Sequence, residues 1–211
     1  MSAKPAAELM ELDPEGGWAG PAAPRLRPPQ RNGAAFNLMS LAARAFGRKQ
    51  VPDIFKVLAI NRRLFWPWLL FASRLMPRGQ LAATDREKVI LRVGWNCRSR
   101  YEWGQHVEIG LRVGLSDQDI LRVARGPQAC ADPFERALLQ ACDELCRESC
   151  IADATWVVLR QRYSDHLLIE LLMLAGHYQM IAGFLNSAGL KLEPPIAEGL
   201  EALHGRLRSQ A

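Results

Sequence analysis

The sequence lacks features that would place it in several common functional classes. It has no dense run of basic residues, because its lysines and arginines are interspersed with acidic residues despite a net charge of +5. This pattern argues against nucleic-acid binding. Its first residues show neither the continuous apolar stretch of a secretion signal nor the pattern of a transit peptide. We therefore expect a cytoplasmic protein that binds no nucleic acid.

Little in the chain suits a lipid bilayer or a disulfide framework. The apolar stretch at 64–72 is short and contains Pro67, and the longer stretch at 167–185 contains Glu170 and His177, which would be costly in lipid. The cysteines number five, and an odd number suits a reducing compartment better than paired disulfides. We expect no membrane span, and a buried helix or a subunit interface at 167–185.

The composition predicts one folded domain with a tail. Hydrophobic residues make up 49% of the 211 residues and charged residues 23%, close to an average globular protein. Residues 1–35 are rich in proline, alanine and glycine and have no sustained period, which predicts a flexible extension. Residues 36–211 are expected to form a single helical domain.

No segment shows sustained strand alternation, so the predicted fold class is all-α, with about seven to nine helices. Capping residues mark the expected helix starts, including a capping box from Thr84 to Glu87, and Gly189 marks an end. The expected helices cover 37–48, 52–59, 61–75 with a break at Pro67, a segment from Thr84, 98–113, a short helix from Ser116 to Gly126, 133–149, 154–162 and 166–188.

Three polar residues share one face of the helix expected at 98–113. Ser99, Glu102 and His106 stand at i, i+3 and i+7, and Glu102 and His106 are neighbours on that face. A carboxylate beside an imidazole sets the ring tautomer and raises its basicity, as a general acid/base pair requires. From spacing alone, an ordinary surface pair is the commoner explanation.

Cys142, Cys146 and Cys150 recur every fourth residue, which suggests either a metal site or the edge of a core stripe. No histidine stands at ligand spacing, and cysteines four apart on a helix lie too far apart for a disulfide. We expect these cysteines to border the core, and we expect no metal and no cofactor.

The segment REKVILRVGWNCRSRYEWGQHVEIGLRVGLSDQDI, which starts at Arg86, resembles the core of the carboxymuconolactone decarboxylase and alkylhydroperoxidase D superfamily. The peroxidase branch carries a helical Glu followed by Cys-x-x-Cys-x-x-x-His, and here the matching positions are Glu87, Ser99, Glu102 and His106. The late stretch LAGHYQMIAGFLNSAGLKLEP also resembles this branch. The resemblance spans about residues 50–195 and implies an alkylhydroperoxidase D-like helical fold.

The resemblance implies acid/base chemistry here, because Ser99 and Glu102 replace both redox cysteines and cannot run a dithiol cycle. The implied activity is that of a decarboxylase or lyase acting on a small anionic or aromatic-derived substrate. His106 would transfer the proton, Glu102 would orient it, and Glu87 would supply a second titratable group or position water. Residues expected to bind the substrate are Arg98, with Arg100 as an alternative, Tyr101 or Trp103, His177, Tyr178 and Asn186.

Two other functions stay open. Cys97, just before the matched positions, could act as a single peroxidatic thiol if it lies in a turn near a helix N-terminus, where the dipole favours the thiolate. The scaffold could instead be a non-catalytic oligomeric binding protein. Family members are typically trimers or multiples of trimers, so the resemblance also implies a homo-oligomer.

Overall fold

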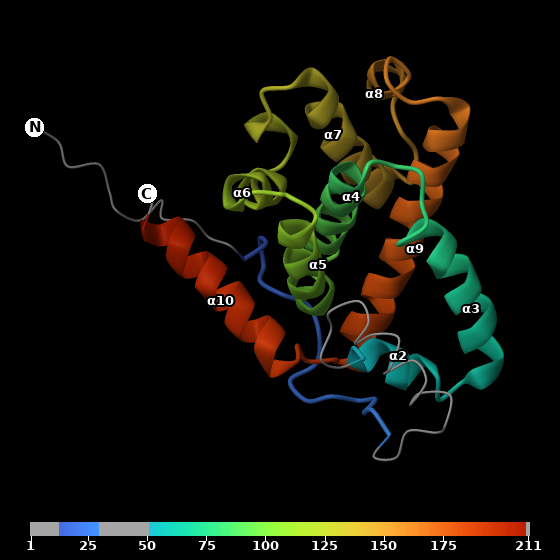
Figure 1. Cartoon of the computed structure of the whole chain (residues 1–211), viewed down its shortest axis with the longest axis vertical. Helices are drawn as coiled ribbons and strands as arrows, with labels where there is room; N and C mark the ends of the chain where they lie inside the picture. Colours follow the sequence, from blue (N-terminus) through green and yellow to red (C-terminus); the bar gives the residue numbers. More distant parts are fainter. Residues whose placement is uncertain (1–12, 30–50, 210–211) are drawn as a thin grey trace, which may run out of the picture.

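The computed structural model describes residues 13–29 and 51–209, and within these ranges it contains nine α helices, one 3-10 turn and no strand (Figure 1). The all-α prediction is therefore confirmed. The elements are α2 (Asp53–Leu58), α3 (Arg62–Leu75), α4 (Ala83–Asn96), α5 (Arg100–Arg112), α6 (Asp117–Arg125), η1 (Pro127–Ala129), α7 (Pro133–Glu148), α8 (Asp153–Leu159), α9 (Asp165–Ala188) and α10 (Pro194–Ser209).

Helices α4 and α5 form an antiparallel hairpin at the centre of the molecule (Figure 1). A tight turn joins them, because Cys97 ends α4 and Arg98 adopts a positive φ of 52°. The Ser99 amide donates to the carbonyl of Gly94, and the Ser99 carbonyl accepts the first hydrogen bond of α5 from Trp103. This turn fixes which residues of the two helices face each other.

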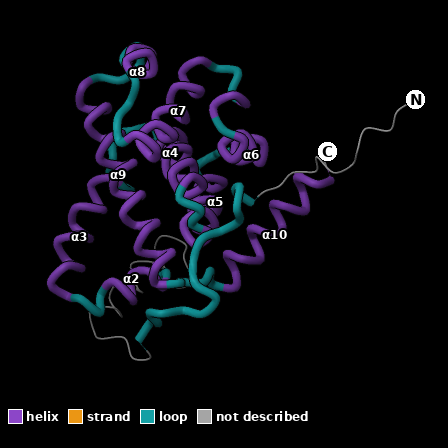
Figure 2. The backbone as a smooth tube through the Cα atoms, turned by 180° about the vertical axis from the view of Figure 1, so that it is seen from behind, coloured by secondary structure: helices purple, strands orange, loops and turns teal. Residues whose placement is uncertain are grey.

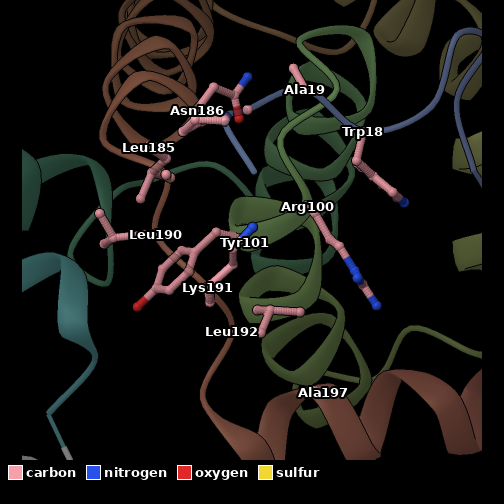
Figure 3. Close-up of a pocket in the computed structure, with 13 residues that line it drawn as sticks. Trp18, Ala19, Arg100, Tyr101, Leu185, Asn186, Leu190, Lys191, Leu192 and Ala197 are labelled. Atoms are coloured by element: carbon pink, nitrogen blue, oxygen red, sulfur yellow. The ribbon is translucent and has the colours of Figure 1, made fainter. Parts of the chain in front are cut away.

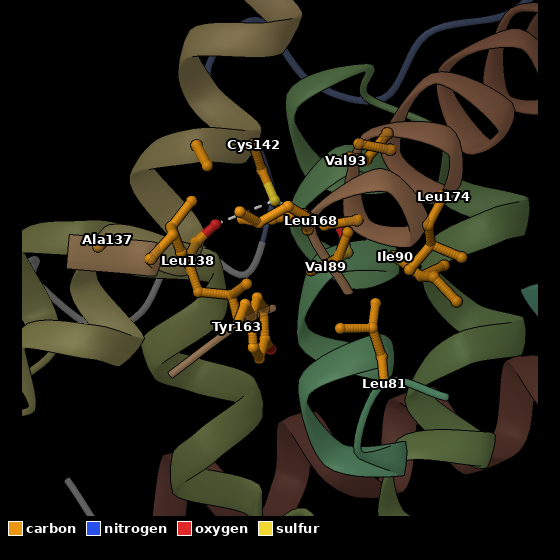
Figure 4. Packing of buried hydrophobic residues seen from close by; sticks show 14 of the residues in the cluster. Leu81, Val89, Ile90, Val93, Ala137, Leu138, Cys142, Tyr163, Leu168 and Leu174 are labelled. Carbon is orange, nitrogen blue, oxygen red and sulfur yellow. Dashed lines mark hydrogen bonds between the residues drawn. The ribbon is translucent and has the colours of Figure 1, made fainter. Parts of the chain in front are cut away.

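The main core lies where α4 packs between α7 and α9 (Figure 4). Val89 and Ile90 of α4 are fully buried there, beside Leu138 of α7 and Leu168 and Leu174 of α9. A second cluster joins α4 and α5 to α6 and α10, the last of which was not predicted as a helix. Burial of this apolar surface is the main force that holds the hairpin between its neighbours.

Several helix ends follow local capping rules. Ser116 and Asp119 form a capping box at the expected start of α6, Asp132 accepts from the amide of Phe134 at the start of α7, and Gly189 ends α9 with a left-handed conformation. The structure contradicts the capping box at Thr84, because α4 starts at Ala83 without a side-chain cap.

Two further boundary predictions were wrong. Helix α3 continues through Pro67 without a break, since a proline removes only its own hydrogen bond and the remaining turns are retained. Helix α5 begins at Arg100 rather than Arg98, because the turn after α4 occupies Arg98 and Ser99. The expected helix at 37–48 lies outside the described residues.

Residues 13–29, expected as part of a flexible extension, lie against the helical body (Figure 2). The ring of Trp18 packs at 5.6 Å from that of Trp95, the amide of Ala19 donates to the carbonyl of Arg98, and the amide of Arg25 donates to the carbonyl of Ala188. An aromatic anchor and backbone hydrogen bonds thus hold this part of the expected extension against the helices.

Helix α9 is, among the described helices, the one long and apolar enough to cross a membrane. Its residues Leu171, Leu174 and Ala175 are fully buried in the main core. The Glu170 carboxylate, near its start, accepts hydrogen bonds from the backbone amides of Gln80 and Leu81 at 2.8 and 3.0 Å. These contacts make α9 a core helix of the bundle.

Candidate functional site

A buried contact between a carboxylate and an imidazole joins α4 to α5 near the middle of the hairpin. Nδ1 of His106 lies 2.7 Å from Oε2 of Glu87, and the side chains of His106 and Glu87 are 9% and 0% exposed. The antiparallel hairpin places the start of α4 beside the later turns of α5, and this brings the two residues together. Glu87, expected to complete a capping box, instead points inward and binds the imidazole.

The structure corrects the expected pairing of Glu102 with His106. Although they are neighbours on α5, the imidazole takes Glu87 as its hydrogen-bond partner, and neither carboxylate oxygen of Glu102 has a hydrogen-bond partner within the described residues. Glu102 lies near the turn of the hairpin. Its Oε1 is so close to Gly94 that a Cβ on residue 94 would lie 3.2 Å from this oxygen. Glu102 and His106 therefore do not form the expected pair.

Glu102 is 2% exposed, and burial raises its pKa well above the ordinary value, with a smaller contribution from Cys146. A buried carboxyl without a hydrogen-bond donor or a cation beside it is most stable when protonated. Ser99, one turn earlier, is fully buried, and its hydroxyl oxygen also lacks a partner within the described residues. This end of the site thus holds a carboxyl whose protonated form is favoured by burial, beside a hydroxyl with no partner among the described residues.

Aromatic and cationic groups surround the Glu87–His106 pair. The ring of Tyr178 meets that of His106 edge-on at 5.0 Å, and the Tyr178 hydroxyl donates to Sδ of Met76 at 3.3 Å. The guanidinium Nε of Arg86 donates to Oε1 of Glu87 at 3.3 Å, and Arg86 is only 6% exposed. Arg86 was missed from the sequence, where nothing beyond its adjacency to Glu87 marked it.

Cys97 occupies the turn between α4 and α5, where the peroxidase alternative placed it, but its surroundings disfavour the thiolate. The pKa of its thiol is raised, first by a hydrogen bond to Cys146 and second by burial. The same hydrogen bond lowers the pKa of Cys146, on α7, against the effect of its own burial. Cys146 was expected only as a border of the core, and no local signal linked it to Cys97.

The other two cysteines of the α7 stripe have separate surroundings. Cys142 is fully buried in the main core, where its thiol donates to the carbonyl of Leu138 at 3.3 Å, whereas Cys150 is exposed. Within residues 13–29 and 51–209, no group of three or more His, Cys, Asp or Glu residues could hold a metal ion.

Helix α9 contributes His177 next to Tyr178. The His177 ring stacks on Trp68 at 6.0 Å and meets Phe71 edge-on at 5.4 Å, and its Nδ1 has no hydrogen-bond partner within the described part of the chain. Burial lowers the pKa of His177 to about 4. His177 is therefore a neutral ring in an aromatic cluster, separated from His106 by Tyr178, whose ring contacts both.

Three residues expected to bind the substrate lie away from the imidazole. Arg98 and Arg100 are exposed, and they contact the carbonyl of Gly16 and the carboxylate of Glu201, respectively. Trp103 is 1% exposed and packs against Trp95 at 4.9 Å in the second core. None of these three side chains lies beside Glu87 and His106.

A cavity of about 310 Å³ lies on another side of α5, under the N-terminal segment (Figure 3). The hydroxyl of Tyr101 donates to Oε1 of Glu193 at 2.7 Å, and Nδ2 of Asn186 donates to the carbonyl of Cys97 at 2.8 Å. The cavity therefore includes three residues predicted to bind the substrate, Arg100, Tyr101 and Asn186, but none of the acid/base residues. It is lined by Trp18, Ala19, Gly20, Pro21, Arg100, Tyr101, Leu185, Asn186, Gly189, Leu190, Lys191, Leu192 and Ala197.

Comparisons with known proteins agree with this architecture. A peroxidase-related protein of Ralstonia eutropha with an alkylhydroperoxidase AhpD core is similar in structure, with a TM-score of 0.72 and 18% identity, covering 83% of this chain and 96% of that one. A peroxidase-related protein of Silicibacter has a TM-score of 0.72 and 16% identity, covering 84% and 95%. No curated protein matches the sequence significantly.

The sequence model of the carboxymuconolactone decarboxylase family matches residues 62–144, which contain α3 to most of α7 and thus the whole α4–α5 hairpin. The solved structures show the same fold over most of the chain. Residues 62–144 of this protein are therefore similar in sequence to the carboxymuconolactone decarboxylase family, and the chain has a fold like that of the alkylhydroperoxidase AhpD core.

Proposed function

We propose that this protein is an acid–base enzyme of the lyase type that decarboxylates a small carboxylate-bearing substrate. The observation that carries the proposal is the buried contact of Glu87 with Nδ1 of His106. A carboxylate at Nδ1 fixes the tautomer and the ring orientation, and it stabilises the imidazolium. Nε2 is then the nitrogen that exchanges a proton with the substrate.

Decarboxylation breaks a carbon–carbon bond and leaves its electron pair on the substrate as a carbanion or enolate. The imidazolium of His106 delivers its Nε2 proton to that carbon, while CO₂ departs and Glu87 keeps the ring in place. Glu102, held as a neutral acid by burial, does not repel an anionic substrate as an ionised carboxylate would. Its carboxyl proton is a second source for the same step.

Arg86 is the cation best placed to bind the substrate carboxylate. Its side chain makes one hydrogen bond within the described residues, from Nε to Glu87, so the terminal guanidinium nitrogens have donors to offer. Arginine binds carboxylates through two parallel N–H donors. This role replaces the one expected for Arg98 and Arg100, whose side chains face solvent.

The test is CO₂ release from a panel of lactone acids and aromatic-derived carboxylic acids. For a substrate that wild type turns over, His106→Gln should lower kcat by about 10²- to 10⁴-fold, the usual contribution of a positioned acid/base group. His166→Gln is the matched control, because His166 is exposed at the start of α9. Turnover of that substrate by His106→Gln at the wild-type rate would refute the proposal.

We also propose that the protein forms a homo-oligomer through α3 and α9, which lie side by side (Figures 1 and 2). Both helices present large apolar side chains to solvent. Exposed apolar area of this extent is typical of an interface between protein subunits. The residues concerned are Leu64, Trp66, Leu70 and Phe71 on α3, and Ile169, Met173 and Met180 on α9.

A further inference from the structure

The cavity under the N-terminal segment is separate from the acid–base pair. Three parts of the helical body meet around it: the first turn of α5, the end of α9 and the stretch that leads from α9 into α10 (Figure 3). Its volume of about 310 Å³ is at the lower end of the range for pockets that hold one small molecule. Its lining does not include Arg86, Glu87 or His106. The cavity is therefore a second place where a small molecule can bind.

Residues 18–21 form the outer wall of this cavity. Trp18 anchors the wall at one end, because its ring packs on that of Trp95 at 5.6 Å. Next to the wall, Gly189 at the end of α9 has a positive φ of 70°, and a Cβ there would lie 2.7 Å from Cγ of Pro21. The glycine thus lets the segment pass close to α9. The wall is packed against the helices at more than one point.

Most of the lining is apolar. The hydroxyl of Tyr101 donates to Glu193 at 2.7 Å and accepts from the amide of Ile54 at 3.2 Å, so its ring is the part that a ligand can contact. Aromatic and aliphatic side chains of this kind favour a ligand with a ring. The apolar lining residues besides Tyr101 include Trp18, Pro21, Leu185, Leu190 and Leu192.

The charged residues of the lining, Arg100 and Lys191, are both cations. Arg100 lies 3.8 Å from the carboxylate of Glu201, but both side chains are more than half exposed, and such a pair contributes little. Lys191 is exposed and has no ion pair with another described residue. Arg100 also begins α5, whose N-terminus has no side-chain cap and is the positive end of the helix dipole. The cavity therefore favours an anion.

Glu193, the carboxylate that follows the lining residue Leu192, does not oppose this preference. It accepts hydrogen bonds from the amide of Asp53 at 2.7 Å, from the hydroxyl of Tyr101 at 2.7 Å and from Nε2 of Gln105 at 2.6 Å. Three donors from α2 and α5 thus stabilise its charge, and Glu193 is not among the lining residues.

We propose that this cavity binds a small aromatic carboxylate, with the ring against the apolar lining and the carboxylate at Arg100 and Lys191. Burial of the ring supplies the apolar part of the binding free energy, and the two cations select for the negative charge. This site is additional to the proposed lyase reaction, and binding there does not depend on His106.

The test uses cinnamate as the probe and cinnamamide, its neutral amide, for comparison. NMR titration of the full-length protein should show saturable binding of one cinnamate per chain with a Kd below about 1 mM. Cinnamamide should bind at least about fivefold more weakly, because it lacks the charge that the cations recognise. Added sodium chloride should weaken cinnamate binding and leave cinnamamide nearly unchanged, since both cations are exposed.

Variants separate the parts of the site. Each of Arg100→Gln and Lys191→Gln should weaken cinnamate binding about three- to fivefold, as expected for an exposed charge pair, and leave cinnamamide nearly unchanged. Arg112→Gln, at an exposed position at the other end of α5, is the matched control. Ala197→Trp fills the cavity and should weaken both ligands at least about tenfold. His106→Gln should bind both ligands as wild type does.

Nuclear Overhauser effects locate the probe. Protons of the cinnamate ring should give effects to the side chains of Trp18 and Leu192, which both line the cavity. Circular dichroism establishes that each variant is folded. Ala197→Leu is the smaller substitution if the tryptophan variant is not.

Three results would overturn the proposal. The first is the absence of saturable cinnamate binding to wild type up to about 5 mM. The second is an affinity for cinnamate in folded Ala197→Trp, or in a protein with both Arg100→Gln and Lys191→Gln, that equals that of wild type. The third is binding that His106→Gln abolishes, because the probe would then occupy the acid–base site.

Discussion

His106 takes its carboxylate partner from another helix: Oε2 of Glu87, nineteen residues earlier in the sequence, lies 2.7 Å from Nδ1. Glu102, its neighbour one turn away on α5, stays without a hydrogen-bond partner within the described residues. The two carboxyl groups of the site therefore have different surroundings: one is in contact with an imidazole, and burial raises the pKa of the other. This difference leads to separable predictions for the two residues.

Glu87→Gln tests the partner of the imidazole. The amide keeps the size of the side chain but removes the negative charge that stabilises a protonated ring and selects its tautomer. We expect kcat on a substrate found for wild type to fall about 10- to 100-fold, as for other changes to a group that orients a histidine. Nitrogen NMR of labelled His106 should show a changed tautomer balance, whereas His166→Gln should leave the His106 signals unchanged.

Glu102→Gln tests the buried neutral carboxyl. Because its pKa is raised in the folded protein, the native state keeps a proton that the unfolded state releases once the pH exceeds the ordinary value of 4.5. The native state therefore loses stability as the pH rises from 4.5 towards the raised pKa. Glutamine has no such proton to lose, so we expect the variant to be about 1 to 3 kcal/mol more stable than wild type at pH 8.

Urea unfolding at pH 8 and at pH 4 measures this difference. The gain should shrink at pH 4, where the carboxyl is protonated in both states. Glu108→Gln, on the same helix and partly exposed, is the control and should change little at either pH. A Glu102→Gln variant that is less stable than wild type at pH 8 would show that Glu102 is ionised and paired in the native protein.

His177 should give the opposite dependence of folding stability on pH. Burial lowers its pKa from 6.5 to about 4, so below pH 6.5 the unfolded state binds a proton that the folded state does not. Stability should therefore fall between pH 6.5 and 4, by up to about 3 kcal/mol from this residue. His177→Phe keeps an aromatic ring between Trp68 and Phe71 and should flatten the curve in that window, as thermal unfolding at several pH values would show.

The sequence was most informative where structure is local. Ser116 and Asp132 lie beside the amides that they cap, so short motifs located α6 and α7. The pairing of His106 was not local, because i, i+4 spacing made Glu102 a neighbour but the turn at Arg98 set which part of α4 faces α5. The family resemblance still placed Glu87 among the site residues, without indicating which carboxyl would bind the imidazole.

Cys146 illustrates what spacing within one helix could not reveal. Its repeat with Cys142 and Cys150 describes only α7, whereas its contact with Cys97 arises from the packing of α4 beside α7. Arg86 was likewise invisible, since its role depends on being buried beside Glu87. Both omissions concern contacts between elements that are set by the tertiary arrangement.

The proposed oligomer predicts the effect of a charge on the exposed face of α9. Met173 is 48% exposed, with Ile169 one turn before it, and a glutamate there would place a charge inside an apolar interface at a cost of several kcal/mol. We expect Met173→Glu to reduce the mass measured by light scattering to that of the 23.6 kDa chain at micromolar concentration. Val157→Glu on α8, at an apolar position that is even more exposed (61%), should leave the assembly intact. If wild type itself has the mass of one chain, or if Met173→Glu keeps the wild-type mass, α3 and α9 are not the interface.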